Sequence, residues 1–175
     1  MLDVAQNSLS AGAANVRLSV CDDAQGIRRL SVEDDGCGMS EEMLRRVCSP
    51  FATSRTTRRV GLGIPLLKMA AELTGGGLSI ESRQGQGTSV EARFVLGHID
   101  CPPLGDMGGT MQLLIQQRPD IHFVYRRSVP GGGFELDTDE LKTQLEEVPL
   151  DHPDVLAFIR QFVNEQEKQL VEVHE

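Results

Sequence analysis

The sequence predicts an α+β fold in which a mostly antiparallel sheet carries its helices on one face, followed by a small α+β extension. Segments with apolar residues at helical spacing are interleaved with segments in which apolar and polar residues alternate, as in half-buried strands. A stretch rich in Gly and Pro, from His98 to Gly109, separates the two parts. We therefore expect one domain at residues 1–97 and the extension at residues 98–175.

The first part is expected to contain three helices and four strands. Helical spacing of apolar residues, with capping and Pro or Gly signals at the ends, predicts helices at 2–13, 40–47 and 64–74. Alternation predicts strands at 15–21, 28–34, 78–83 and 88–96. The turn at Asp22–Gly26 predicts that the first two strands pair as a hairpin, and 49–60 is expected to be a loop.

The extension is expected to begin with a helix near 107–115, followed by two short strands and two acidic helices. Ile121, Phe123 and Tyr125 alternate as in a strand, and the glycines at 131–133 turn the chain toward a second strand that ends near Leu136. The last helix is expected to begin at 151–154, where proline falls in its first turn.

Composition excludes several classes of function. The net charge of −9 over 175 residues disfavours binding to the phosphate backbone of DNA or RNA. No apolar run reaches the ~20 residues of a membrane helix, and the first residues lack the features of a signal peptide. We therefore expect a cytoplasmic protein without a membrane or nucleic-acid partner.

The cysteines predict no metal site or disulfide framework, because none of them forms a C-x-x-C pair. Free thiols are expected at Cys21, Cys37, Cys48 and Cys101.

Two carboxylates stand out by their surroundings. Asp3 and Asn7 lie four residues apart on the first helix, so both face the same side and could present oxygens to a hard cation or to a hydroxyl group. Asp34 follows a strand and precedes Gly36 and Gly38, where a carboxylate could accept a hydrogen bond from the amino group of adenine while the glycines admit a flat base. Each pattern alone is also typical of a solvated helix face or an ordinary turn.

Two glycine-rich segments complete the candidate site. Gly61-Leu62-Gly63 precedes a helix, and free N–H groups at a helix N-terminus bind phosphate. Arg55 and Arg58-Arg59 could add positive charge there, or could be solvated loop residues. Gly85-x-Gly87-Thr88 could place a hydroxyl beside a base, or could be a plain hairpin turn.

In combination, the order and spacing of these segments resemble the GHKL (Bergerat-fold) ATPases, which include histidine kinases, gyrase-type topoisomerases, 90-kDa chaperones and mismatch-repair ATPases. The resemblance covers residues 1 to about 96. The matching segments are the N box at 3–8, the G1 box at 32–39, the opening of the ATP lid at 50–54, the G2 box at 61–63 and the G3 box at 85–88.

The resemblance implies ATP and Mg²⁺ as cofactors and assigns a role to each matching residue. Asn7 would bind Mg²⁺, Asp34 would receive the adenine amino group, and Thr88 would act beside Asp34 through a water. Gly36 and Gly38 would flank the base, and Gly61 and Gly63 would meet the phosphates. Met39 and Leu62 would line the pocket. The lid would contribute to phosphate binding through Thr53, Ser54, Arg55 and Arg58.

The chain departs from the family pattern at the expected general base. The family usually has glutamate four residues before the N-box asparagine, but here that position is Asp3, in the first turn of the helix. A displacement near 1 Å can cost ~100-fold in rate, so ATP binding is better supported than turnover. Because related chains usually have more sequence before this helix, we expect the native sequence to extend upstream of Met1.

Two further departures limit the function. The lid is short and residues 98–175 leave no room for a large transducer domain, so mechanical work is not expected. None of the four histidines lies in a phosphoacceptor helix, so any phosphoryl acceptor would belong to another protein; these are His98, His122, His152 and His174.

The extension resembles a family of small stand-alone ATP-binding proteins, similar to anti-sigma-factor kinases and often encoded near iron-only hydrogenase genes. The similarity is carried by residues 98–107 and 119–125. Two functions follow as alternatives: a protein kinase acting on Ser or Thr of a separate regulatory partner, with Asp3 as the catalytic residue, or a nucleotide-gated interaction module with little turnover. The apolar face of the last helix is expected to pack on its own domain, although it could instead pair two chains into a homodimer.

Overall fold

The structure is a computed structural model that describes residues 1–48 and 62–172. The first part consists of α1 (Leu2–Ser10), β1 (Asn15–Asp22), β2 (Ile27–Asp34), α2 (Glu41–Cys48), α3 (Gly63–Leu73), β3 (Gly77–Arg83) and β4 (Gly87–Val95). The extension consists of α4 (Met107–Gln117), β5 (His122–Val129), β6 (Gly132–Asp137), α5 (Thr138–Leu145) and α6 (Pro153–Glu172).

The first helix ends earlier than its apolar spacing predicts, at Ser10 instead of residue 13. Gly12 has a positive φ of 72°, which turns the chain out of the helix. The carboxylate of Asp35 then accepts hydrogen bonds from the backbone N–H groups of Ala14 and Asn15, both at 2.8 Å. A side chain 20 residues away therefore ends this turn, and local periodicity does not reveal it.

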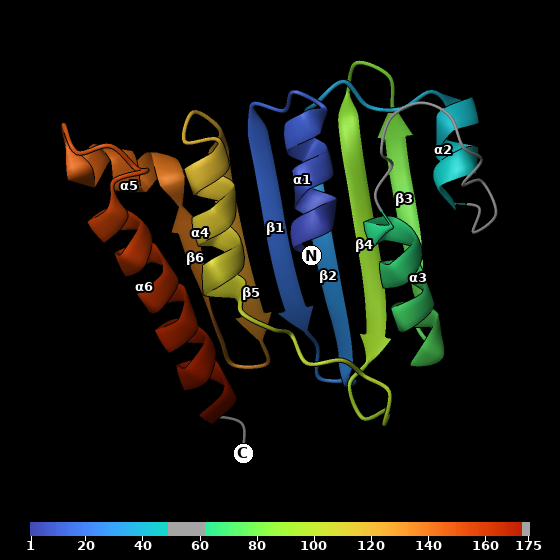
Figure 1. Ribbon diagram of the computed structural model, residues 1–175. Coiled ribbons are helices and arrows are strands. Elements are labelled where there is room, and N and C mark those ends of the chain that lie inside the picture. Colours follow the sequence, from blue (N-terminus) through green and yellow to red (C-terminus); the bar gives the residue numbers. More distant parts are fainter. Residues whose placement is uncertain (49–61, 173–175) are drawn as a thin grey trace.

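The six strands form one sheet in the order β3-β4-β2-β1-β5-β6 (Figure 1). The predicted hairpin of β1 and β2 is antiparallel, with Val16 opposite Asp34 and Val20 opposite Leu30. All pairings are antiparallel except that of β1 with β5, which is parallel. The predicted fold class is confirmed, and the strands of the extension continue the sheet of the first part.

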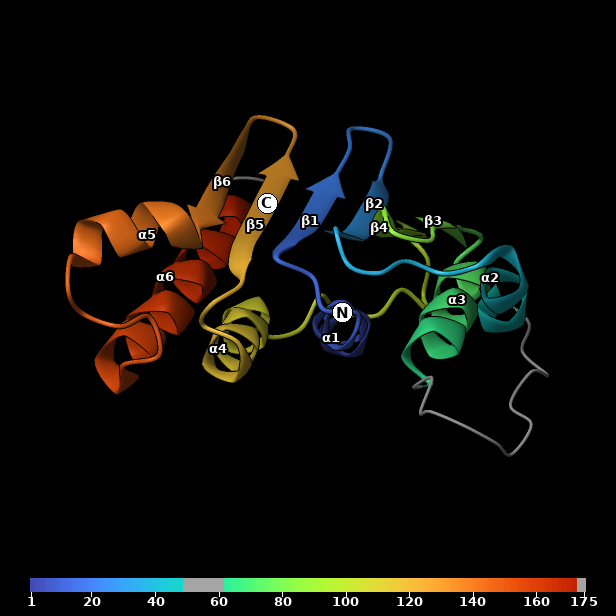
Figure 2. The same cartoon turned by 90° about the horizontal axis from the view of Figure 1, so that it is seen from above.

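The helices α1, α3, α4 and α6 lie on one side of this sheet (Figure 2). Along β1, Val16, Leu18 and Val20 are buried beneath them, whereas Arg17 between these positions is exposed. This alternation is the period of two that lets a strand cover a core with one face and meet water with the other.

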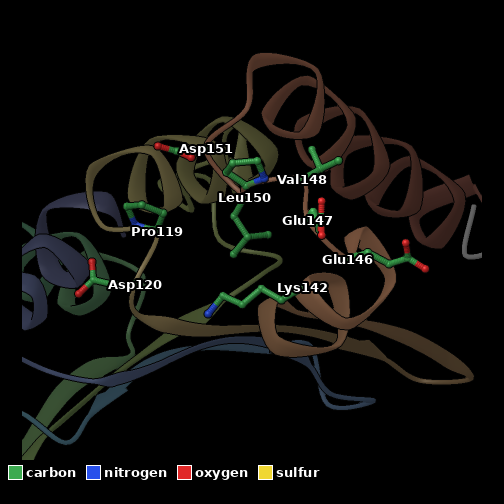
Figure 3. A pocket seen from close by; sticks show the side chains of 9 residues that line it. Pro119, Asp120, Lys142, Glu146, Glu147, Val148, Leu150 and Asp151 are labelled. Carbon is green, nitrogen blue, oxygen red and sulfur yellow. The ribbon is translucent and has the colours of Figure 1, made fainter.

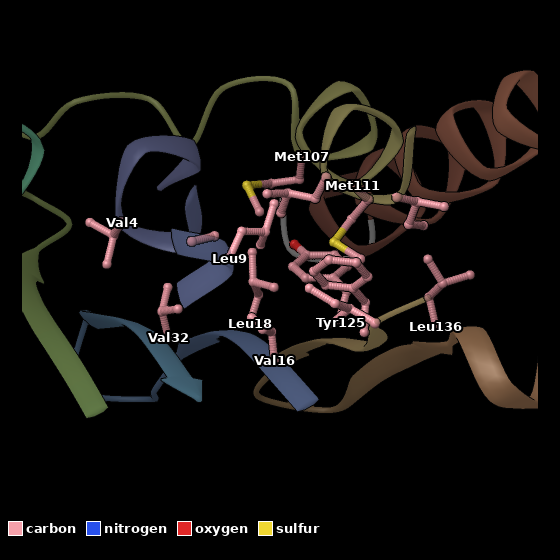
Figure 4. Close-up of a cluster of buried hydrophobic side chains, with 14 of the residues drawn as sticks. Val4, Leu9, Val16, Leu18, Val32, Met107, Met111, Tyr125 and Leu136 are labelled. Carbon is pink, nitrogen blue, oxygen red and sulfur yellow. The ribbon is translucent and has the colours of Figure 1, made fainter. Parts of the chain in front are cut away.

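One hydrophobic core runs under both parts of the chain (Figure 4). Val4 and Leu9 of α1 and Leu18 of β1 belong to the same cluster as Met111 of α4 and Tyr125 of β5. Each such side chain contributes about 1.5–3 kcal/mol on burial, so the extension stabilises the first part directly.

A buried charge cluster ties the extension to the first hairpin. Arg127 of β5 is 2% exposed and donates to Asp22 of β1 at 2.6 Å and to Glu167 of α6 at 3.0 Å. Arg28 of β2 also binds both carboxylate oxygens of Asp22, and the hydroxyl of Tyr125 donates to Glu167. Burial alone would raise the pKa of Asp22, but hydrogen bonds from Arg28 and Arg127 outweigh it and hold that pKa below its ordinary value.

Cys21, Cys37 and Cys101 are free thiols. The side chain of Cys48 lies outside the described part of the chain. Within the described residues, no helix is both long and apolar enough to cross a bilayer.

Candidate functional site

Asp34 stands at the end of β2 with its carboxylate fixed from two sides. The hydroxyl of Ser8, on α1, donates to Oδ2 at 2.6 Å, and the backbone N–H of Gly36 donates to Oδ1 at 2.9 Å. A carboxylate offers about four acceptor positions, and the residues that the structure describes use two of them, so two remain for an external N–H donor as far as these residues show. Asp34 is half-buried, which leaves this carboxylate oriented yet accessible.

The loop after Asp34 packs against the β3–β4 hairpin at two glycines. A Cβ at Gly38 would lie 2.0 Å from the carbonyl oxygen of Arg83, and a Cβ at Gly87 would lie 1.9 Å from that of Asp34. Real Cβ atoms do not approach so closely, so only glycine allows this contact. The close approach at Gly38 and Gly87 is therefore to the protein's own backbone.

Ser82 of β3 joins the same loop and hairpin through its hydroxyl. Its Oγ accepts from the backbone N–H of Met39 at 2.8 Å and donates to the carbonyl oxygen of Gly87 at 3.0 Å. It also lies 2.9 Å from the hydroxyl of Thr88. Since Ser82 has one proton and Gly87 takes it, Thr88 donates to Ser82 and keeps acceptor positions for a water or a ligand.

Thr88 and Asp34 are neighbours across the sheet. The two residues are directly paired between β2 and β4. The structure therefore brings together the predicted carboxylate and the predicted hydroxyl, although they lie 54 positions apart in the sequence.

Asp3 and Asn7 lie on α1, which packs against the first turn of α3. A Cβ at Gly63 would lie 2.6 Å from the Cβ of Asp3, so glycine allows the two helices to approach there. Asp3 is exposed, and Asn7, one turn later, is half-buried. The predicted pair of Asp3 and Asn7 thus lies on α1 beside the start of α3, where phosphate binding is predicted.

The first turn of α3 is suited to bind an anion. No side chain caps it at Leu62, within the described residues, and the helix dipole adds partial positive charge there. Leu62, at the start of α3, is 63% exposed, and Met39, in the loop after β2, is half-buried. The other predicted phosphate contacts lie outside the described residues: Thr53, Ser54, Arg55, Arg58 and Gly61.

Comparison with known proteins decides the family. Residues 1–98 match the family described as histidine kinase-, DNA gyrase B- and HSP90-like ATPases. This match covers more than half of the chain. The chain belongs to this ATPase family.

Relatives in the family are much longer proteins. The sensor histidine kinase AruS of Pseudomonas aeruginosa is 33% identical over 117 residues, which are 61% of this chain and 12% of the relative. The mismatch repair protein MutL of Halobacterium salinarum is 35% identical over 117 residues, which are 62% of this chain and 18% of the relative. Among solved structures, the MutL ATPase domain of Aquifex aeolicus complexed with ADP is 17% identical, with a TM-score of 0.45 over 83% of this chain and 65% of that one.

The ATPase-family residues fit a nucleotide by their own chemistry. Asp34 offers acceptor positions that the described residues do not use, Thr88 offers a second acceptor, and the start of α3 offers N–H donors. Within the described ranges, no group of three or more His, Cys, Asp and Glu side chains is placed to hold a metal ion. A magnesium ion held by Asn7 would therefore take further ligands from phosphate oxygens, as Mg²⁺ sites with bound nucleotides do.

The sequence argument missed three residues that build the site: Ser8, Ser82 and Asp35. Ser8 had a detectable signal, because it lies on the same face of α1 as Val4, Ala5 and Leu9 and is 2% exposed. A hydroxyl in an apolar stripe needs a partner, and that partner is Asp34. Ser82 and Asp35 carry no such signal, since each acts across a contact made only in the folded chain.

An open depression of about 480 Å³ lies elsewhere, in the extension (Figure 3). Its lining includes Leu150, Lys142 and four acidic residues, which are Asp120, Glu146, Glu147 and Asp151. It shares no residue with the predicted nucleotide site around Asp34.

Proposed function

We propose that this chain is a Mg-ATP-binding regulatory protein of the cytoplasm that transfers a phosphoryl group to a Ser or Thr of a separate protein. The observation that carries the proposal is the carboxylate of Asp34, which Ser8 and Gly36 orient while residues 1–48 and 62–172 leave two of its acceptor positions unused. An acceptor that is already oriented matches the amino group of adenine, and no further free energy is needed to orient it when the nucleotide binds.

The remaining residues would hold the rest of the nucleotide. Thr88 would accept through a water beside Asp34, and the N–H groups at the start of α3 would bind phosphate. The side-chain oxygen of Asn7 would bind Mg²⁺, which offsets the charge on the phosphates when it is present. Arg55 and Arg58 of the lid would add positive charge.

Asp3 would act on the acceptor hydroxyl. Its carboxylate is exposed beside the start of α3, on the side where the phosphates are expected. It would orient the hydroxyl of the partner's Ser or Thr and take its proton as the new O–P bond forms and the bond to ADP breaks. The products are ADP and a phosphorylated partner, and the proton passes from Asp3 to water.

A second candidate function is a nucleotide-gated interaction module without significant turnover. It is favoured by the position of Asp3 in the first turn of α1, where a side chain one methylene shorter than glutamate must reach the acceptor. In that case ATP would change the surface that a partner contacts, and Asp3 would be dispensable.

Nucleotide binding at Asp34 can be measured by calorimetry with ATP and ADP, with and without Mg²⁺. We expect Asp34→Asn to weaken ATP by about 5- to 150-fold, the effect of losing about 1–3 kcal/mol. Asp23→Asn is a matched control, because Asp23 also accepts backbone N–H groups but lies in the far turn of the same hairpin. Equal binding by wild type and Asp34→Asn would exclude adenine from this carboxylate.

Phosphoryl transfer can be tested with labelled ATP and a cell extract. We expect a labelled protein that is absent when Asp3→Asn replaces wild type, while ATP affinity changes less than twofold. If no labelled protein depends on Asp3, and Asp3→Asn still binds the same partners, the interaction module is the better account.

A further inference from the structure

Three polar side chains lie in one row across the sheet. Ser82 of β3 is paired with Thr88 of β4, and Thr88 is paired in turn with Asp34 of β2. Residues directly opposite each other in antiparallel strands project to the same face, with Cβ atoms about 4.5–5.5 Å apart. That face carries the core, since Val90, two residues beyond Thr88, is buried. Ser8 of α1 reaches Asp34 from the same side, so the row faces the region where the nucleotide is expected.

The hydrogen bonds of this row run in a fixed direction. The hydroxyl of Ser82 accepts from the backbone N–H of Met39 and gives its single proton to the carbonyl oxygen of Gly87. The hydroxyl oxygens of Ser82 and Thr88 lie 2.9 Å apart, so the proton between them comes from Thr88. A hydroxyl group has one proton, and Thr88 therefore has none to give to another neighbour.

The proton of Thr88 has a second acceptor within reach, which is the carboxylate of Asp34. Asp34 is the direct cross-strand neighbour of Thr88, and a carboxylate accepts stronger hydrogen bonds than a neutral oxygen does. Nevertheless, the hydrogen bonds among the described residues include none between these two side chains. Ser82 thus holds the proton of Thr88 away from Asp34 and leaves acceptor positions open on both.

A binding edge made only of acceptors distinguishes adenine from purines that carry an oxygen at position 6. The amino group of adenine donates hydrogen bonds, whereas the oxygen of guanine or hypoxanthine at the same position only accepts them. That oxygen would meet the carboxylate of Asp34 and the oxygen of Thr88 with no proton between them. A site whose polar groups are left unpaired rejects a ligand strongly. The direction of the Thr88 proton therefore bears on which base fits.

We propose that Ser82 is a positioning residue that makes this site selective for adenine nucleotides over 6-oxopurine nucleotides. It acts through Thr88, whose hydroxyl it holds as an acceptor toward the base or a bridging water. Without Ser82, the proton of Thr88 would turn to Asp34 and compete with the adenine amino group, or would turn to the oxygen of a 6-oxopurine and admit it. The inference rests on the proposed role of Asp34 in binding adenine.

The test compares the dissociation constants of ATP and inosine triphosphate for the full chain, by calorimetry with Mg²⁺. Hypoxanthine, the base of inosine triphosphate, differs from adenine in having an oxygen in place of the amino group and an N–H at position 1. We expect wild type to bind ATP about 100-fold more tightly than inosine triphosphate. Ser82→Ala should reduce this preference about three- to tenfold. A preference that stays as in wild type would overturn the role of Ser82.

A second variant separates this role from a loss of structure. Ser82→Ala also leaves the N–H of Met39 and the oxygen of Gly87 without this partner. A loosened loop would weaken both nucleotides alike and leave their ratio unchanged. Thr88→Val removes the hydroxyl of Thr88 but keeps Ser82 and its bonds to the loop and the hairpin. Adding Ser82→Ala to Thr88→Val should therefore leave the ratio as it is in Thr88→Val alone, and a further change of the ratio would contradict the proposal.

Two more variants complete the experiment. Ser79→Ala is the matched control on β3, because Ser79 is exposed, and it should leave both dissociation constants unchanged. Asp34→Asn carries an amide that can donate to the oxygen of hypoxanthine, so it should lose the preference for ATP. If Asp34→Asn loses the preference and Ser82→Ala keeps it, Ser82 has no such role and the adenine site stands. If wild type binds the two nucleotides equally, the adenine site at Asp34 is itself wrong.

Discussion

The hydroxyl of Ser8 is the contact that orients Asp34 from the helix side. It lies in the apolar face of α1, is 2% exposed, and donates over 2.6 Å to a carboxylate. A hydrogen bond to a charged group contributes about 1.5–3 kcal/mol, more than one between neutral groups. At the scale of a single residue, Ser8 therefore links helix packing to the geometry of the site.

We expect Ser8→Ala to lower the free energy of unfolding by about 1–3 kcal/mol and to weaken ATP severalfold, because Asp34 loses one of its two fixed donors. Urea unfolding and calorimetry measure the two effects. Ser10→Ala is the matched control on the same helix, since Ser10 donates to a backbone oxygen in an exposed position. If the two variants behave alike, Ser8 does not orient Asp34.

Among the elements, the contact between the loop after β2 and the β3–β4 hairpin decides the shape of the site. Gly38 and Gly85 both have a positive φ, 62° and 77°, which disfavours any residue with a Cβ. They differ in surroundings, because a Cβ at Gly38 meets the Arg83 oxygen at 2.0 Å and a Cβ at Gly85 meets nothing within 4 Å.

Gly85→Ala should therefore cost about 1–2 kcal/mol of stability, which is the backbone strain alone. Gly38→Ala should cost at least about 3 kcal/mol, because the loop must also move away from the hairpin. Thermal unfolding of the two variants gives this comparison directly. Similar melting temperatures would mean that the loop and the hairpin are not in contact as described.

At the scale of the whole molecule, two features hold the extension to the first part. One is the hydrophobic core that both parts share, and the other is the cluster of Arg127, Asp22 and Glu167. This cluster connects β5 and α6 with β1. It lies at one end of the β1–β5 pairing, and His122 lies at the other end. Its charges are largely buried, so each depends on the others for compensation.

The cluster predicts how stability changes with pH. The folded-state pKa of Asp22 is lower than its ordinary value of 3.8, so its stabilising contribution is complete above that value and is lost as the pH falls through the folded-state pKa. We expect the free energy of unfolding to drop below about pH 4 and Asp22→Asn to flatten this acid limb. Denaturant unfolding between pH 2 and 7 measures it. Asp23→Asn, in the adjoining turn, should leave the limb in place; an unchanged limb in Asp22→Asn would contradict the prediction.

The sequence by itself determined the alternation of helices and strands, the hairpin of β1 and β2, and the boxes that mark the ATPase family. These depend on short-range patterns, namely a period of 3.6 or 2 and glycines at fixed offsets, which are written in adjacent residues. It also identified Asp34 and Thr88 as partners, and the pairing of β2 with β4 places them side by side.

Only the tertiary structure decided the rest. Three examples are the parallel pairing of β1 with β5, the hydrogen bond from Ser8 to Asp34, and the hydrogen bonds that connect Asp35 to His122 through Asn15. These contacts join residues between 20 and 107 positions apart in the sequence. Such contacts follow from which strands meet and which faces pack, and a single sequence carries no local signal for them. The same reason explains why His122, which the sequence marks only as a strand or loop residue, lies in the structure where the extension meets the loop after β2.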